Sequence, residues 1–186
     1  MIIELTTQHL ILKEPSNDDC QQIIDFEKRN QDHLAPWEST GSNVSVEDKI
    51  AAWTKDSQEK RAIRFLIRKK ESPDIVIGFV NFTQIFYGAF KACYLGYKID
   101  FQYQGKGLMQ EALKCAIDFM FEKQDLHRIM ANYMPANIRS GKVLAKLGFL
   151  IEGYAKNYLL INNTWEDHIL TALSREQWEI RHRCHR

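Results

Sequence analysis

Two glycines spaced one residue apart, Gly105 and Gly107, stand between an apolar run that ends at Ile99 and a helical pattern that continues to about Lys123. The first N–H groups of a helix have no partner inside the helix, and glycines let a ligand come close to them. Such a turn favours an anion, most often a phosphate group. A tight strand-to-helix connection without a ligand would have the same sequence, so the turn alone leaves both interpretations open.

The turn matches neither of two common phosphate-binding motifs. A Walker P-loop requires Gly-x-x-x-x-Gly-Lys-Ser/Thr, whereas Lys106 lies between the glycines and Leu108 follows them. A dinucleotide-binding fingerprint requires a third glycine at position 110, where the chain has Gln110. Nucleotide sites of these two kinds are therefore excluded for this turn.

Apolar periodicity predicts the elements that hold the turn. Helices are expected at Asn17–Arg29, at Ser45–Ser57 with Ser45 as its cap, from Gly107 to about Lys123, and at 137–147, where Gly148 ends the helix. Strands are expected at 8–13, 62–68, 74–86, 91–99, 127–133, 149–161 and 164–173, the last two joined by a tight turn at Asn162-Asn163. The order indicates a mixed α/β fold in one domain, residues 1–186.

Composition restricts the class of protein. The 186 residues are 45% hydrophobic and 26% charged with a net charge of +1, so direct DNA binding is not expected. No apolar run reaches membrane-spanning length, and the N-terminus lacks a signal-peptide pattern. The four cysteines form no CxxC pair and no metal-ligand spacing, which predicts a cytoplasmic protein without a metal. The basic residues 181–186 are expected to form a frayed tail, with a tether to RNA as the alternative.

Residues around the turn resemble a known family. Gln102-x-x-Gly105-x-Gly107 and Asn137-x-x-Ser140 resemble the acetyl-CoA signature of the GNAT N-acetyltransferases. Similarity to the RimJ/RimL ribosomal-protein branch, most of all to its RimJ type, extends over nearly the whole chain. It is carried by the segments 33–38, 92–99, 103–113, 127–141, 146–154, 152–161 and 165–173. The resemblance implies a splayed, mostly antiparallel sheet of about seven strands flanked by helices, and acetylation of the N-terminal alanine of a small-subunit ribosomal protein.

The resemblance also implies where acetyl-CoA binds. The pantetheine arm is expected to pair with main-chain groups of one strand, those of Tyr97, Lys98 and Ile99. One amide of this strand would face the thioester oxygen. The pyrophosphate is expected on the amides of Gln104, Gly105, Lys106, Gly107, Leu108 and Met109. The side chain of Lys106 would either add charge near a phosphate or remain solvated.

Asn137 and Ser140 are expected on the other side of the pantetheine arm. Asn137 corresponds to the family's pantetheine contact, and it can also cap the helix that follows. Ser140 would donate a hydrogen bond to the departing sulfur as a general acid, or else bond back to its own chain.

The general base and the acceptor groove are less defined. An α-amine has a pKa of about 7.7–8.0, so roughly a tenth is already neutral at pH 7 and a weak base acting through water suffices. RimL-like enzymes place a proposed catalytic Glu where this chain has Asn157, which cannot take a proton. Glu38 is the alternative base, or a solvated carboxylate, and Tyr94 is a further candidate. Trp37 is expected to line the acceptor groove or to pack in the core.

Direct transfer is the expected mechanism, because no cysteine lies in a triad-like setting that would favour an acyl-enzyme. Two alternatives stay open. The acceptor could be a small amine, an amino-sugar or a lysine side chain. The chain could instead act as a binding factor on pre-ribosomal particles, with acetyl-CoA as a structural ligand.

Overall fold

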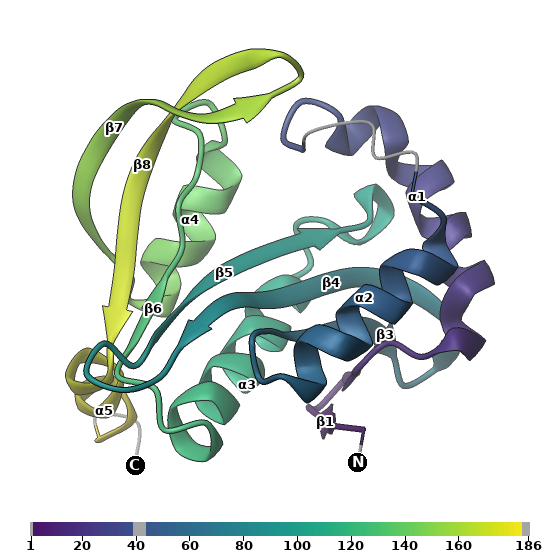
Figure 1. The fold of residues 1–186 in the computed structure, drawn as a ribbon, viewed down its shortest axis with the longest axis horizontal. Helices are drawn as coiled ribbons and strands as arrows, with labels where there is room; N and C mark the ends of the chain where they lie inside the picture. The colour runs from purple at the N-terminus through teal and green to yellow at the C-terminus, as the bar shows by residue number, and fades with distance from the viewer. Residues whose placement is uncertain (1, 39–43, 184–186) are drawn as a thin grey trace.

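The computed structural model describes residues 2–38 and 44–183, and its described strands form one eight-stranded sheet (Figure 1). The strand order is β1-β2-β3-β4-β5-β6-β8-β7, and all neighbours are antiparallel except β5 and β6. The strands are β1 (Glu4–Thr6), β2 (Leu10–Lys13), β3 (Ile63–Lys69), β4 (Ser72–Phe86), β5 (Ala92–Ile99), β6 (Arg128–Met130), β7 (Leu150–Ile161) and β8 (Thr164–Ser174). The α-helices are α1 (Cys20–Leu34), α2 (Val46–Gln58), α3 (Leu108–Lys123), α4 (Ile138–Leu147) and α5 (Arg175–Arg183).

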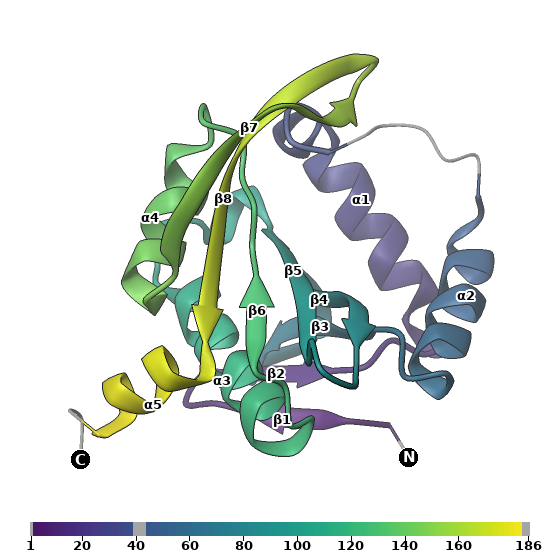
Figure 2. The same ribbon diagram turned by 60° about the vertical axis from the view of Figure 1, so that its left-hand side comes forward.

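Each face of the sheet carries its own core, because alternate side chains of a strand point to opposite faces. On one face, Phe65 and Phe82 pack in one cluster with Leu113 and Met120 of α3. The other face has a smaller core, in which α1 and α2 cover β3 and β4. It consists of Ile23, Phe26, Val46, Ile50, Leu66, Val76 and Phe79. Figure 2 shows α1 and α2 together on one side of β4 and β5, with α4 on the opposite side.

The predicted mixed α/β fold and its mostly antiparallel sheet are confirmed, with eight strands in place of about seven. Ser45 caps α2 by accepting from the N–H of Asp48 at 3.0 Å. Gly148 ends α4 with a left-handed φ of 93°. Asn162 and Asn163 have φ angles of 49° and 62° between paired Ile161 and Thr164, the conformation that two-residue hairpin turns favour.

Several boundaries differ from the prediction. The first helix continues to Leu34, five residues beyond Arg29, and β6 is shorter than the expected 127–133. β1 and α5 were not expected, because β1 has three residues and α5 has no buried residue in its polar sequence. The frayed tail is wrong for residues 181–183, which belong to α5, and residues 184–186 lie outside the described chain.

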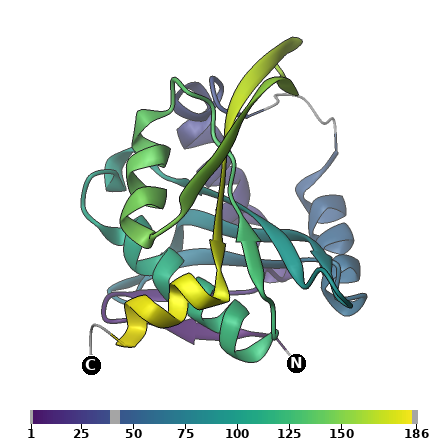
Figure 3. The same cartoon turned by 90° about the vertical axis from the view of Figure 1, so that its left-hand side faces the viewer.

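The sheet opens between β5 and β6. These strands pair only over Ala92–Tyr94 with Arg128–Met130, and the chain after β6 turns toward β8, where Ala131 N donates to Thr171 O at 2.9 Å. Residues 95–99 of β5 therefore have β4 as their only strand neighbour in the described chain. Figure 3 shows α4 and the β7–β8 hairpin standing beside this opening. The expected splay lies at this position.

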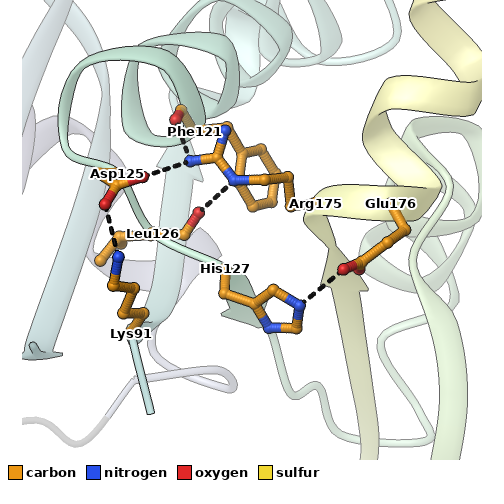
Figure 4. Close-up of polar contacts among 7 residues, drawn as sticks. All are labelled: Lys91, Phe121, Asp125, Leu126, His127, Arg175 and Glu176. Atoms are coloured by element: carbon orange, nitrogen blue, oxygen red, sulfur yellow. Dashed lines mark hydrogen bonds and ion pairs between the residues drawn. The ribbon is translucent and has the colours of Figure 1, made fainter. Parts of the chain in front are cut away.

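The start of α5 is tied to the end of α3 (Figure 4). Arg175 donates to the carbonyl oxygens of Phe121 and of Leu126, the latter at 3.1 Å, and to Asp125 at 3.3 Å. Asp125 also accepts from Lys91 at 2.6 Å, and His127 contacts Glu176 at 2.9 Å. One guanidinium thus satisfies two carbonyls near a helix C-terminus. In the described chain, no helix is both long enough and apolar enough to cross a membrane.

We expect Arg175→Ala to lower the free energy of unfolding by about 1–3 kcal/mol, because two carbonyls lose their donor. Urea denaturation measures this loss. The matched control is Arg183→Ala in the same helix, whose side chain is 81% exposed and 3.8 Å from Glu179. Its effect should stay within about 0.5 kcal/mol. Equal losses for the two variants would contradict the role of Arg175.

Candidate functional site

The glycine turn leaves a row of main-chain donors without partners. Gly105 and Gly107 have φ angles of 70° and 77°, and Gly107 is the N-cap of α3. The first N–H to close the helix is that of Glu111, which donates to Gly107 O at 3.0 Å. Between residues 105 and 110, no N–H has an acceptor within the described chain. A Cβ added at either glycine would meet nothing within 4 Å, so a phosphate can approach these amides.

The set of unpaired amides differs at both ends from the set that was predicted to bind the pyrophosphate. The N–H of Gln104 donates to Phe101 O at 3.3 Å, so it is already engaged in a turn. The N–H of Gln110, which is not in the predicted set, also has no acceptor within the described chain. Leu108 and Met109 bury their side chains against the core, which fixes the start of α3. The ammonium of Lys106 lies 5.4 Å from the centre of the Tyr103 ring.

A buried carboxylate anchors this turn to α1. Asp100 is fully buried and accepts hydrogen bonds from Arg29 Nε at 2.6 Å, from Asn30 Nδ2 at 3.1 Å and from the N–H of Gln102 at 2.9 Å. Asn30 also accepts from the N–H of Phe101 at 2.9 Å. Burial alone would raise the pKa of Asp100, but these hydrogen bonds and the Arg29 charge together hold it below its usual value. The carboxylate is therefore ionised at neutral pH.

The open edge of β5 offers main-chain groups to a ligand. The carbonyl of Lys98 points toward β4, because a Cβ added at Gly78 would lie 2.6 Å from this oxygen. The N–H of Ile99 lies trans to that carbonyl and so points to the opening, and by alternation so do the main-chain groups of Tyr97. Of the three predicted strand residues, Tyr97 and Ile99 thus present main-chain groups to the opening, whereas the Lys98 carbonyl faces β4.

Tyr97 and Ser140 meet between β5 and α4. The Tyr97 hydroxyl lies 2.7 Å from Ser140 Oγ and donates to Ser140 O at 3.2 Å. Burial raises the pKa of Tyr97 to about 12, partly offset by the Ser140 hydrogen bond, so this phenol stays protonated at neutral pH. Asn137 caps α4 by accepting from the N–H of Ser140 at 3.1 Å. The Ser140 hydroxyl can therefore donate a hydrogen bond to an atom placed beside it, with the protonated Tyr97 hydroxyl as its neighbour.

The opposite face of β5 carries the other predicted residues. Lys98 Nζ donates to Glu38 Oε2 at 3.0 Å and lies 5.1 Å from the Phe79 ring centre. Gly96 has nothing within 4 Å of an added Cβ, so the surface between Tyr94 and Lys98 is open. Trp37 is half-buried, and its main-chain N–H donates to Leu34 O at 2.8 Å. Glu38 is thus ion-paired, and it lies on the face of β5 opposite to Ser140.

Tyr94 belongs to a second polar group on that face. Burial and the neighbouring Tyr158 hydroxyl raise the pKa of Tyr94. Tyr158 in turn accepts from Asn132 Nδ2 at 3.0 Å, and its ring centre lies 5.3 Å from that of His168. Tyr94 is the last β5 residue paired with β6. Its hydroxyl is therefore a neutral hydrogen-bonding group near the point where the strands part.

Position 157 has no carboxylate but contacts one. The N–H of Asn157 donates to Asp167 Oδ1 at 2.8 Å, and the Tyr154 hydroxyl donates to Asp167 Oδ2 at 2.6 Å. These two hydrogen bonds lower the pKa of Asp167. A carboxylate with a lowered pKa is a weaker proton acceptor, so Asp167 does not replace the missing Glu as a base.

Sequence reasoning missed three side chains at this site: the Tyr97 hydroxyl, the Gln104 amide and the Arg139 guanidinium. The strand pattern of 91–99 placed Tyr97 on the face of Cys93 and Leu95, which was a usable signal. For Gln104 and Arg139, 35 residues apart, no local pattern indicates contact.

The chain is similar to known proteins of one family. The family model described as "Acetyltransferase (GNAT) domain" matches residues 9–150. The [ribosomal protein uS5]-alanine N-acetyltransferase of Escherichia coli (strain K12) is 42% identical over 181 residues, covering 95% of this chain and 93% of that protein.

Two solved structures share the whole fold. The ribosomal-protein-S5-alanine acetyltransferase of Vibrio fischeri is 39% identical with a TM-score of 0.87, and the match covers 95% of this chain and 98% of that one. Mycobacterium smegmatis RimJ in complex with CoA-disulfide is 26% identical with a TM-score of 0.84, covering 95% and 88%. The similarity to these two structures therefore extends over nearly the whole chain.

Proposed function

The chain belongs to the GNAT acetyltransferase family, and from that premise we propose that it acetylates the N-terminal α-amine of ribosomal protein uS5, at alanine, in the cytoplasm. It is an acetyl-CoA-dependent N-acetyltransferase. The observation that carries the choice of acceptor is the similarity to an enzyme named for that reaction over nearly the full length of both chains. The glycine turn and the open edge of β5 support the use of acetyl-CoA, because they offer unpaired amides to phosphates and to an extended arm.

Direct transfer fits the arrangement of the two faces of β5. The amine nitrogen attacks the thioester carbon from the face of Lys98 and Glu38, the carbon–sulfur bond breaks, and the sulfur leaves on the side of Ser140. An N–H of the open edge, that of Tyr97 or Ile99, stabilises the thioester oxygen as it gains charge. Ser140, supported by the protonated Tyr97, donates to the sulfur.

A weak base suffices for an α-amine. Roughly a tenth of such amines is neutral at pH 7 before any enzyme acts. The proton that the nitrogen loses after attack passes through water to Glu38. Its Oε2 pairs with Lys98, and its Oε1 takes no part in that hydrogen bond. Tyr94 and its neighbour Tyr158 orient this water. Trp37, next to Glu38, lines the entrance for the acceptor.

Mass spectrometry of small-subunit ribosomal proteins tests the proposal. A strain without the gene should carry uS5 with a free N-terminal alanine, and re-expression should restore one acetyl group. In parallel, the purified enzyme should acetylate a peptide that begins with the uS5 sequence and ignore the same peptide with a blocked N-terminus and a free lysine. Unchanged uS5 in the deletion strain refutes the acceptor. A role in assembly on pre-ribosomal particles is supported only if a Gly107→Glu enzyme restores ribosome assembly without acetylation.

We expect Ser140→Ala to lower kcat by about tenfold to a hundredfold, because the departing sulfur loses its donor. The affinity for coenzyme A should change by less than about threefold, since the glycine turn is untouched. Tyr97→Phe should act in the same direction, and the double variant should be little worse than Ser140→Ala because the two hydroxyls act as a unit. Ser174→Ala is the control, at the last residue of β8, where Ser174 Oγ accepts from the N–H of Gln177 in α5. A normal kcat for Ser140→Ala would exclude Ser140 from the chemistry.

A further inference from the structure

The side chain of Gln104 connects three elements beside the glycine turn. Its Oε1 accepts a hydrogen bond from the Arg139 guanidinium, in the first turn of α4. Its Nε2 lies 2.6 Å from Nε2 of His33, near the end of α1. The His33 ring packs edge-on against Phe101 at 5.6 Å between centres. Arg139 is thereby held next to the unpaired amides that begin at Gly105.

Arg139 has an unusual partner for a cation. Its side chain is exposed, and within the described chain its hydrogen bond goes to a neutral amide, with no carboxylate in an ion pair. The acidic residue of the first turn of α3, Glu111, is already bound by Thr7 and by His9 at 2.8 Å. A guanidinium prefers a bidentate contact with a phosphate over a single contact with an amide. Arg139 is therefore available to a phosphate placed at the turn.

The other cation of the turn is oriented differently. The ammonium of Lys106 lies 5.4 Å from the centre of the Tyr103 ring, and the ammonium of Lys69 lies 5.9 Å from the centre of the same ring. Arg139 reaches the turn from α4, across the opening from β5. The two cations thus approach the turn from different elements, and Arg139 is the one that connects α4 to the turn, through Gln104.

We propose that Arg139 is a phosphate-binding residue for coenzyme A, and that it exchanges Gln104 for a phosphate oxygen when the ligand binds. The inference rests on the acetyl-CoA-dependent function and adds to it a residue outside the glycine turn. No covalent bond changes. Gln104 keeps the guanidinium at the turn, so that binding replaces one hydrogen bond by a stronger, charge-assisted one.

Substitutions of Arg139 and of Gln104 should have opposite effects on the affinity for coenzyme A, which titration calorimetry measures. Arg139→Ala should bind about tenfold more weakly or worse, because a charge-assisted contact is lost. Gln104→Ala should bind about threefold more tightly, because Arg139 no longer has to break a bond. Lys142→Ala, an exposed cation one turn further along α4, is the control and should stay within about twofold.

Two further measurements separate phosphate binding from a structural role. Pantetheine, which lacks phosphate, should bind Arg139→Ala and the parent protein equally. The gain in affinity for coenzyme A from Gln104→Ala should disappear in the double variant that also carries Arg139→Ala. The proposal is overturned if Arg139→Ala binds coenzyme A normally, if it loses pantetheine equally, or if both single variants weaken binding to the same extent. Failure of the parent protein to bind coenzyme A would instead refute the function itself.

Discussion

Replacing Gly107 with glutamate is expected to lower the affinity for coenzyme A by about a hundredfold or more. Two effects combine. Gly107 has a φ of 77°, which costs a residue with a Cβ about 1–2 kcal/mol. The new carboxylate also enters the space in front of unpaired amides, where it competes for donors whose charge-assisted hydrogen bonds are each worth about 1.5–3 kcal/mol. Titration calorimetry with coenzyme A measures the loss.

Gly88 supplies a matched control for the backbone effect. It lies in the turn between β4 and β5 with a φ of 73°, and an added Cβ there also meets nothing within 4 Å. Gly88→Glu should therefore lower the free energy of unfolding about as much as Gly107→Glu and leave coenzyme A binding intact. If both variants bind coenzyme A normally, the phosphates do not lie at the glycine turn. If both lose binding, the loss reflects strain and not the site.

The location of the glycine turn could be predicted because its causes are local. A strand, two glycines and an amphipathic helix follow one another within about 30 residues, and each has its own signal. Asn137 and Gly148 likewise mark both ends of α4 through their own chemistry. The same reasoning found the Asn162-Asn163 turn, since φ angles above zero favour asparagine.

Contacts between distant segments could not be predicted from such signals. The pairing of Lys98 with Glu38 joins positions 60 residues apart, and it changes Glu38 from a loop carboxylate to an ion-paired one. The hydroxyl pair of Tyr97 and Ser140 spans 43 residues. α5 escaped prediction for a different reason: it buries no residue, and Arg175 anchors it to carbonyls of another helix.

Helix α1 connects several parts of the site. Arg29 and Asn30 hold Asp100 before the glycine turn, and His33 contacts Gln104. At its end, the carbonyl of Ala35 accepts from Asn162 at the tip of the β7–β8 hairpin at 2.6 Å. The helix therefore links the glycine turn to the tip of the β7–β8 hairpin. A change at Asp100 should consequently affect more than local stability.

We expect Asp100→Asn to lower the free energy of unfolding by about 3 kcal/mol at pH 7. Removing one partner of a buried ion pair costs about 3–5 kcal/mol, and the lower end applies because the Arg29 side chain is 32% exposed. The asparagine amide would also face the donors of Arg29 and Asn30. Urea denaturation measures the loss, and coenzyme A affinity should fall as well, because the turn loses its anchor.

The pH dependence of this variant provides an independent test. The pKa of Asp100 is lowered in the folded protein, so its contribution to stability is fully present above its ordinary pKa of about 3.9 and is lost as the pH falls through the lower folded value. The parent protein should therefore lose stability below about pH 4 more steeply than Asp100→Asn. Asp125→Asn removes an ion-paired carboxylate whose side chain is 76% exposed. It should lower the free energy of unfolding at pH 7 by less than Asp100→Asn does. Equal losses at positions 100 and 125 would show that burial of the Asp100 pair does not stabilise the turn.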